Sequence, residues 1–173
     1  MTVNPDELFP VVDPAGNVIG SATRSECHTG VSRPLPPVVH LHVCRDGMLY
    51  LQPRSPLKDI QPGRWDTSVG GHVDYGESVA DALRRESREE LELDIDGMEI
   101  IAIPPYLFES PRERELINPH VVVISDGTEP SPDPDEISEG RFWSIPEIER
   151  AIGTGVLTPN FEQEFAIIKP FLK

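Results

Sequence analysis

The feature that most constrains the fold of this chain is an amphipathic helix expected from Ser78 to about Leu91. Val79, Ala82 and Leu83 recur at three- and four-residue spacing, so one face of this helix should pack against a core. Ser78, with an acid three residues later, is typical of a helix N-terminus. The remaining elements of the chain must therefore cover the apolar face of a central helix.

The C-terminal half of the same helix carries three glutamates on one side. Glu86, Glu89 and Glu90 fall within an arc of roughly 100°. Like charges at these spacings cost a few tenths of a kcal/mol per pair, and the helix dipole disfavours each carboxylate by roughly 0.3–1 kcal/mol. A solvated acidic face is one interpretation. A divalent cation site is the other, because Gly70-Gly71 lets the backbone approach a ligand, and Mg²⁺ and Mn²⁺ prefer oxygen ligands.

The charge balance limits the partners of the chain. Its 173 residues include 15 basic and 30 acidic side chains, a formal net charge of −15, which disfavours nucleic acid polymers and anionic membranes. A phosphorylated substrate remains compatible if a divalent ion reverses the local sign of the potential. The acidic, proline-broken start and the lack of a run of roughly 18 apolar residues predict a cytoplasmic protein. Cys27 and Cys44 form no CxxC pair, so we expect reduced thiols.

Short apolar runs on both sides of the central helix predict strands. We expect one domain over residues 1–173, folded as an α/β/α sandwich with a mixed β-sheet. The expected strands are two around a turn at residues 13–17, a hairpin from residues 36–44 and 48–52, a buried strand at 121–124 and another at 142–143. Further helices are expected near residues 145–152 and 161–171.

The stretch from residue 71 to residue 93, GHVDYGESVADALRRESREELEL, closely resembles the Nudix box. That pattern is Gly, five residues, Glu, seven residues, then Arg-Glu-apolar-any-Glu-Glu-any-Gly-apolar. The matching positions are Gly71, Glu77, Arg85, Glu86, Glu89, Glu90 and Leu93. Ser87 and Glu92 depart from it, at an apolar position and at the glycine that normally ends the helix. We therefore expect this helix to end differently, running on toward Asp94.

The resemblance implies a role for each of these residues. Glu86, Glu89 and Glu90 would be catalytic and would bind one to three Mg²⁺ ions, with Mn²⁺ as the alternative, and the Gly71 carbonyl would complete the coordination. Arg85 would pair with Glu77 as structural support. The acid that activates water stays open, and the candidates are Glu86, Glu89, Glu113, Glu115, Asp135 and Glu136.

Residues 9–28, 59–66 and 142–143 also look like a Nudix subgroup related to isopentenyl-diphosphate isomerase. Those isomerases place a catalytic cysteine just before the Gly-His that opens the box, and this chain has Gly70 there. The resemblance therefore implies a hydrolase that cleaves a diphosphate linkage, in a nucleoside diphosphate derivative or a similar organic diphosphate, by water attack at phosphorus. An isomerase and an inactive binding module are the alternatives.

Four further residues are candidates for contact with the substrate or with the metal ligands. His72 corresponds to a metal-binding histidine of the isomerases. His40 and His42 alternate with apolar residues and should share one strand face, and Glu115 is an acid that follows the box. Trp65, Tyr106 and Phe108 are expected either to stack on a base or to belong to the core. Neither the substrate nor the oligomeric state follows from the sequence.

Overall fold

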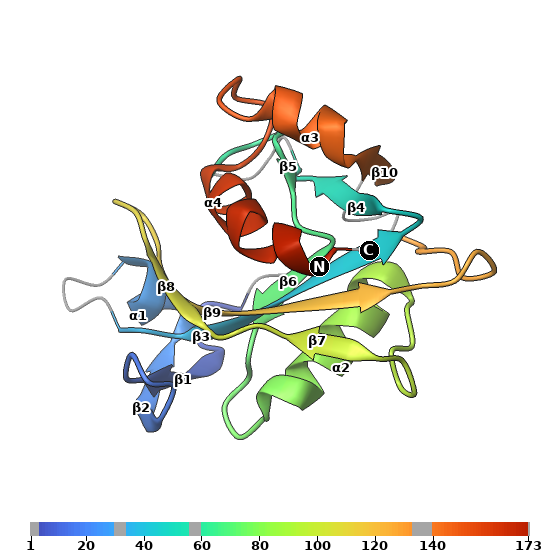
Figure 1. Cartoon of the computed structure of the whole chain (residues 1–173). Coiled ribbons are helices and arrows are strands. Elements are labelled where there is room, and N and C mark those ends of the chain that lie inside the picture. Colours follow the sequence, from blue (N-terminus) through green and yellow to red (C-terminus); the bar gives the residue numbers. More distant parts are fainter. Residues whose placement is uncertain (1–3, 30–33, 56–59, 133–139, 173) are drawn as a thin grey trace.

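The two longest strands of the chain run parallel at the centre of a mixed sheet. The computed structural model describes residues 4–29, 34–55, 60–132 and 140–172 (Figure 1). β3 (Pro37–Arg45) is parallel to β9 (Arg114–Val123), and the main path of the sheet runs β10-β4-β3-β9-β7. β5, β6 and β8 pair with β4, β3 and β9. The remaining strands of this sheet are β4 (Met48–Pro53), β5 (Trp65–Asp66), β6 (Val69–His72), β7 (Ile100–Ala102), β8 (Tyr106–Glu109) and β10 (Arg141–Ser144).

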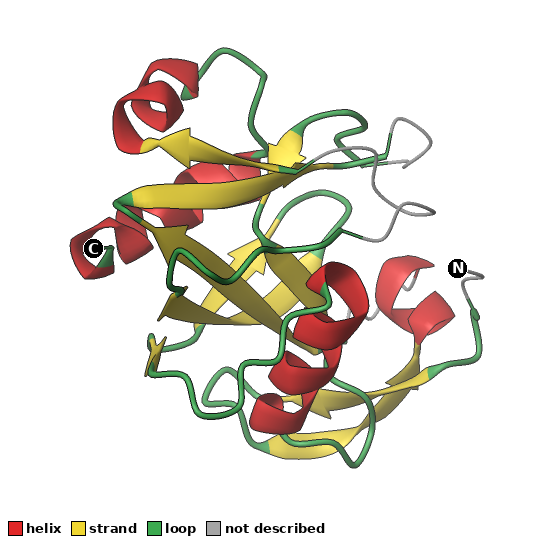
Figure 2. Cartoon of the chain, turned by 90° about the vertical axis from the view of Figure 1, so that its right-hand side faces the viewer, coloured by secondary structure: helices red, strands yellow, loops and turns green. Residues whose placement is uncertain are grey.

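Helices cover both faces of this sheet (Figures 1 and 2). α2 (Val79–Leu91) lies on one face, whereas α3 (Ile145–Ala151) and α4 (Pro159–Ile168) lie on the other. The predicted α/β/α sandwich with a mixed sheet is therefore confirmed. The other elements are the hairpin of β1 (Leu8–Val12) and β2 (Val18–Thr23), α1 (Arg24–Thr29) and a 3-10 turn (Lys169–Phe171). Within the described residues, no helix combines the length and apolar character needed to cross a membrane.

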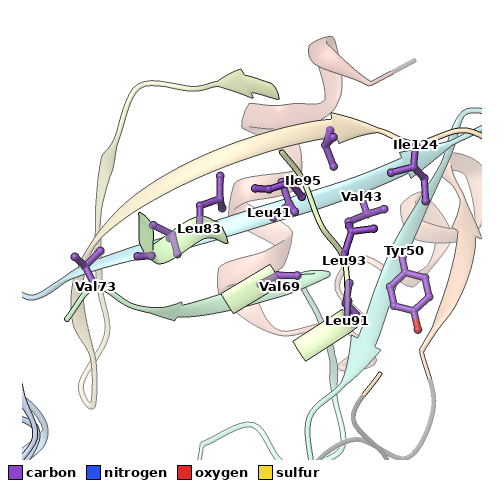
Figure 3. Packing of buried hydrophobic residues seen from close by; sticks show 13 residues of the cluster. Leu41, Val43, Tyr50, Val69, Val73, Leu83, Leu91, Leu93, Ile95 and Ile124 are labelled. Carbon is purple, nitrogen blue, oxygen red and sulfur yellow. The ribbon is translucent and has the colours of Figure 1, made fainter. Parts of the chain in front are cut away.

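Alternation along β3 assigns its side chains to the two faces. Val39, Leu41 and Val43 are fully buried and pack in the cluster that α2 covers (Figure 3). Burying side chains of this size contributes roughly 1.5–3 kcal/mol each. His40 and His42 point the other way, toward Glu164 of α4. The prediction that the two histidines share one face is therefore confirmed, and on that face they meet a buried carboxylate.

The local turn signals of the sequence correspond to the observed connections. β3 and β4 form the predicted hairpin, and the two residues between them, Asp46 and Gly47, have φ angles of 54° and 74°. Positive φ at both central positions is what a two-residue hairpin turn of type I′ requires. The strands and helices expected around residues 9–22, 121–124, 142–143, 145–152 and 161–171 are likewise present, with shifted bounds.

The end of α2 corrects one expectation. The helix stops at Leu91, and Glu92 takes the left-handed conformation, with a φ of 51°. Its N–H bonds to the Arg88 carbonyl, and the N–H of Leu93 bonds to the Ser87 carbonyl. The prediction that the helix runs on toward Asp94 is therefore wrong. The turn keeps the geometry of a glycine cap, although a glutamate occupies it.

Candidate functional site

Arg85 organises the start of the candidate site. Its Nε and Nη2 donate to the two carboxylate oxygens of Glu77, both at 2.9 Å, and Nη2 also donates to the His72 carbonyl at 3.0 Å. This is the pairing with Glu77 that the resemblance implied. Because Glu77 lies before α2 and Arg85 within it, the ion pair fastens the loop after β6 onto the helix. The paired guanidinium lowers the pKa of Glu77, so this carboxyl stays charged.

Glu86 lies directly against the backbone of β6. A Cβ atom built on Gly71 would be 2.2 Å from the carboxyl carbon of Glu86, so only glycine fits at position 71. Arg85 donates to Glu86 at 2.6 Å. Burial raises the pKa of Glu86 to about 7; Arg85 opposes this shift, and the charges of Glu89 and Asp74 add to it. Near neutral pH such a carboxyl is only partly ionised. A bound cation would stabilise its charged form.

The other two glutamates flank Glu86 on the same turn of α2. Glu90 accepts a hydrogen bond from the N–H of Gly70 at 3.0 Å, so it also faces β6. Glu89 is the most open of the three, with 46% of its side chain exposed, and lies 3.4 Å from Arg85. Glu86 and Glu90 thus meet Gly71 and Gly70 where α2 packs on β6, and Glu89 lies on the same turn of the helix. The donor set is hard, acidic and glycine-lined, and it fits a divalent cation such as Mg²⁺.

A second group of acids lies at the start of β9. The carboxyl of Glu115 is 3.9 Å from Nε2 of His72, whose ring stacks on Phe9 with centroids 4.3 Å apart. Burial raises the pKa of Glu115 to about 7, and the charge of Glu113 raises it further. Burial also raises the pKa of Glu113, opposed by Arg54. His72 and Glu115 therefore lie together, and both stay candidates for contact with the substrate or with the metal ligands.

The third part of the site is a buried network that includes a residue the sequence did not reveal. Nδ1 of His40 lies 2.9 and 3.1 Å from the two carboxylate oxygens of Glu164, and His42 contacts the same carboxylate. Tyr106 donates its hydroxyl to Glu164 at 2.6 Å. Burial alone would raise the pKa of Glu164, but the two histidines lower it, so it is an anion. Among the described residues, these two histidines and Glu164 are also a group that could hold a metal ion.

Other candidates lie outside this arrangement. Trp65 packs edge-on against Trp143, with ring centroids 5.3 Å apart, and Phe108 is buried in a small cluster, so both act in packing here. Asp135 and Glu136, two of the candidate bases, lie outside the described residues. Cys44 is fully buried on β3, and Cys27 lies on α1, so neither takes the place of the missing cysteine beside Gly71.

An α/β/α sandwich that sets such a glutamate-rich helix against a Gly-Gly strand is the arrangement of Nudix proteins. The chain belongs to this family: the family described as NUDIX domain matches residues 34–161, well over half of its length.

The relatives of this chain include enzymes of two kinds. An isopentenyl-diphosphate Delta-isomerase of Brevibacterium linens is 30% identical over 173 residues, which cover 96% of this chain and 93% of that protein. A Nudix hydrolase of Deinococcus radiodurans is 34% identical over 145 residues, covering 82% and 81%. A crystal structure from Deinococcus radiodurans superposes with a TM-score of 0.70 at 26% identity, over 88% of this chain and 92% of the other. Family and fold are thus shown, and both activities occur among the relatives.

Proposed function

We propose that this protein is a Mg²⁺-dependent Nudix hydrolase that cleaves the diphosphate linkage of a nucleoside diphosphate derivative or a similar organic diphosphate. The observation that carries the proposal is the contact of Glu86 with Gly71 and of Glu90 with Gly70 where α2 meets β6, with Glu89 on the same turn of the helix. We also infer that residues 1–173 form one Nudix domain, because α2 and α4 pack on opposite faces of the same sheet.

Each residue of the site has its own role in the proposed reaction. Glu86, Glu89 and Glu90, with the carbonyl of Gly71, would hold Mg²⁺, which when bound offsets the charge of the diphosphate and makes water more acidic. The ion pair of Arg85 and Glu77 holds the loop after β6 against α2. One carboxylate accepts the proton of the attacking water. Glu89 is open enough to meet water, and Glu115 is a second candidate because its raised pKa suits a base near neutral pH.

An isomerase of the isopentenyl-diphosphate type is the second candidate function. Relatives with that activity and the pairing of His72 with Glu115 favour it. The residue just before Gly71 argues against it, because Gly70 has no acidic proton to give to carbon. A hydrolase needs no side chain at this position, which is why we favour hydrolysis.

A panel of diphosphates distinguishes these functions. The purified protein is incubated with Mg²⁺ and ADP, ATP, ADP-ribose, UDP-glucose or isopentenyl diphosphate, and the products are followed by ³¹P NMR and chromatography. We expect cleavage between two phosphorus atoms in at least one compound, abolished by EDTA and restored by Mg²⁺. Conversion of isopentenyl diphosphate to its isomer without phosphorus release would mean an isomerase, and binding of panel compounds without turnover would mean an inactive module.

The residue assignment has its own test in Glu90→Gln. The amide keeps the shape of the side chain and can still accept from Gly70, but it loses the charge that attracts a cation. We expect turnover to fall by about 100-fold or more, as is typical when a charge that stabilises the transition state is lost, with circular dichroism unchanged. Glu99→Gln, at an exposed acid before β7, is the matched control. Equal turnover of Glu90→Gln and the control would exclude Glu90 from the site.

A further inference from the structure

The network around Glu164 leaves one ring edge of His40 beside Gly70 of β6. Nδ1 of His40 is engaged by Glu164, so the nitrogen left for another partner is Nε2. The side chain of His40 is 11% exposed, whereas the side chains of His42 and Glu164 are fully buried. Of these three side chains, His40 is therefore the one that can meet a ligand.

Gly70 leaves this ring edge uncovered. A Cβ atom at Gly70 would lie 3.2 Å from Cδ2 of His40 and 3.5 Å from its Nε2. The N–H of the same glycine binds Glu90. Gly70 thus binds Glu90 through its N–H and lies beside the imidazole of His40, so a diphosphate bound at the carboxylates of α2 would reach Nε2 by extending past Gly70.

Glu164 holds the ring in one orientation. Its carboxylate is fully buried and is contacted by His40, His42 and the hydroxyl of Tyr106, and Tyr106 in turn accepts a hydrogen bond from Asn160 at 2.9 Å. With so many donors, Glu164 is an acceptor only, so Nδ1 of His40 must carry a proton. A histidine fixed this way cannot rotate without leaving a buried anion short of a donor.

We propose that Nε2 of His40 donates a hydrogen bond to a phosphate oxygen of the diphosphate substrate, and that Glu164 is the residue that positions it. The proposal rests on the proposed hydrolase function and adds a cationic contact to a site otherwise lined with acids. Burial alone would lower the pKa of His40, but Glu164, together with Asp66 and Glu115, raises it to about 9, so the ring carries a proton on both nitrogens near neutral pH. A charge-assisted hydrogen bond to phosphate oxygen is roughly twice as strong as a neutral one.

A metal ion held by His40, His42 and Glu164 is the competing explanation of this cluster. If His42 bound a metal through Nε2, its proton would move to Nδ1, which has no partner among the described residues. That would leave a buried N–H unpaired, whereas metal-bound histidines normally donate this proton. In the hydrogen-bonded arrangement, Nδ1 of His42 is only an unused acceptor. The contacts therefore favour a positioned histidine.

Kinetics test the contact through substitutions at His40. With Mg²⁺ and the panel compound that wild type cleaves fastest, we expect His40→Phe to lower kcat by about 100-fold, the loss typical of one transition-state donor. His40→Gln should recover part of this, because its amide can reach the place of Nε2. His120→Gln is the matched control, since His120 is a buried histidine on the next strand that bonds to the His40 carbonyl. Unchanged kcat and KM in His40→Phe would overturn the proposal.

A second readout does not depend on turnover. In protein labelled with ¹⁵N-histidine, the Nε2 signal of His40 should shift when Mg²⁺ and methylenediphosphonate are added together. Glu164→Gln should change the tautomer signals of His40 before any ligand is added, and Gly70→Ala should reduce the ligand-induced shift. Gly127→Ala, where a Cβ meets nothing within 4 Å, should behave as wild type.

The outcomes separate the two proposals. Absence of cleavage in the panel overturns the hydrolase, while the NMR experiment still decides the contact. Cleavage by wild type with an unmoved His40 signal in the presence of the diphosphonate overturns the contact alone. Stoichiometric zinc in the purified protein, lost in His42→Ala, would replace the proposal with a metal site at this cluster.

Discussion

At the scale of single residues, the candidate site depends on a glycine that has no room for a side chain. Gly71 lets the carboxyl group of Glu86 reach the backbone of β6, and a Cβ atom there would be only 2.2 Å from the carboxyl carbon. We expect Gly71→Ala to push Glu86 out of place and to weaken Mg²⁺ binding by about tenfold or more, as calorimetry would measure, because a misplaced ligand costs at least one coordination bond.

The control for this substitution is Gly20→Ala, at a glycine of β2 where a Cβ meets nothing within 4 Å. Both substitutions reduce the flexibility of the unfolded chain equally. A difference in Mg²⁺ affinity between the two variants therefore reports on the steric clash with Glu86. Equal Mg²⁺ affinity in the two variants would show that Glu86 is not a ligand in the position described.

The raised pKa of Glu86 gives a second prediction at this scale. In the metal-free protein its pKa is about 7, so below pH 7 a proton competes for the carboxylate. Binding of Mg²⁺ at pH 6 should therefore release about one proton, and the apparent affinity should rise about tenfold per pH unit until pH 7 and level off above it. Calorimetry in two buffers of different ionisation enthalpy measures the released proton. Glu86→Gln should retain at most weak binding without this proton release, and equal release in both proteins would contradict the assignment.

At the scale of elements, α2 ends in a conformation that its sequence disfavours. Glu92 has a φ of 51°, a region in which a non-glycine residue costs roughly 1–2 kcal/mol. We expect Glu92→Gly to raise the free energy of unfolding by about 1 kcal/mol, because relief of strain exceeds the added freedom of the unfolded chain. Thermal unfolding should show a gain of about 2–4 °C for a chain of this size.

Glu92→Ala separates strain from charge. It removes the carboxylate from the acidic end of the helix but keeps the Cβ atom that causes the strain, so most of the gain should be absent. If alanine and glycine stabilised the protein equally, the destabilisation caused by Glu92 would come from charge repulsion and not from its left-handed backbone.

The sequence predicted the elements whose signals are local. The apolar spacing of α2, the alternation along β3 and the turn at Asp46-Gly47 each lie within a few residues, and each is present in the structure. The end of α2 was predicted wrongly because tertiary packing of Leu91 and Leu93 holds the turn, and propensity alone does not show this.

Glu164 was missed because its partners are far away in the sequence. Its contact with His40 spans 124 residues, and no local pattern brings them together. One signal was available: Glu164 lies three residues after Phe161 and four before Ile168, on the apolar face of its helix. A lone acid on such a face is rarely buried without a partner, so the sequence could have indicated a buried ion pair but not its members.

At the scale of the whole molecule, the acidic composition bears on the proposed cation site. The chain carries a net charge of −15 and places three of its carboxylates on one helical turn beside β6. Such a site costs stability until a cation neutralises it, since self-repulsion and the burial of Glu86 both disfavour the charged folded state. If the proposed cation binds, function and stability would therefore be opposed in the metal-free protein and aligned in the metal-bound one.

The destabilisation expected from the three glutamates in the absence of a cation predicts how stability responds to Mg²⁺. With Mg²⁺ at about 100 times its dissociation constant, binding adds roughly 2.7 kcal/mol to the folded state, which raises the melting temperature by about 5–10 °C. The variant with Gln at positions 86, 89 and 90 should melt above wild type in EDTA at pH 8, where Glu86 is otherwise charged, and should gain nothing from Mg²⁺. At pH 5 a protonated Glu86 no longer costs stability, so the advantage of the variant should shrink. A variant less stable than wild type in EDTA at pH 8 would show that the glutamates are held by Arg85 and the backbone alone, and that the helix carries them for structure and not for a cation.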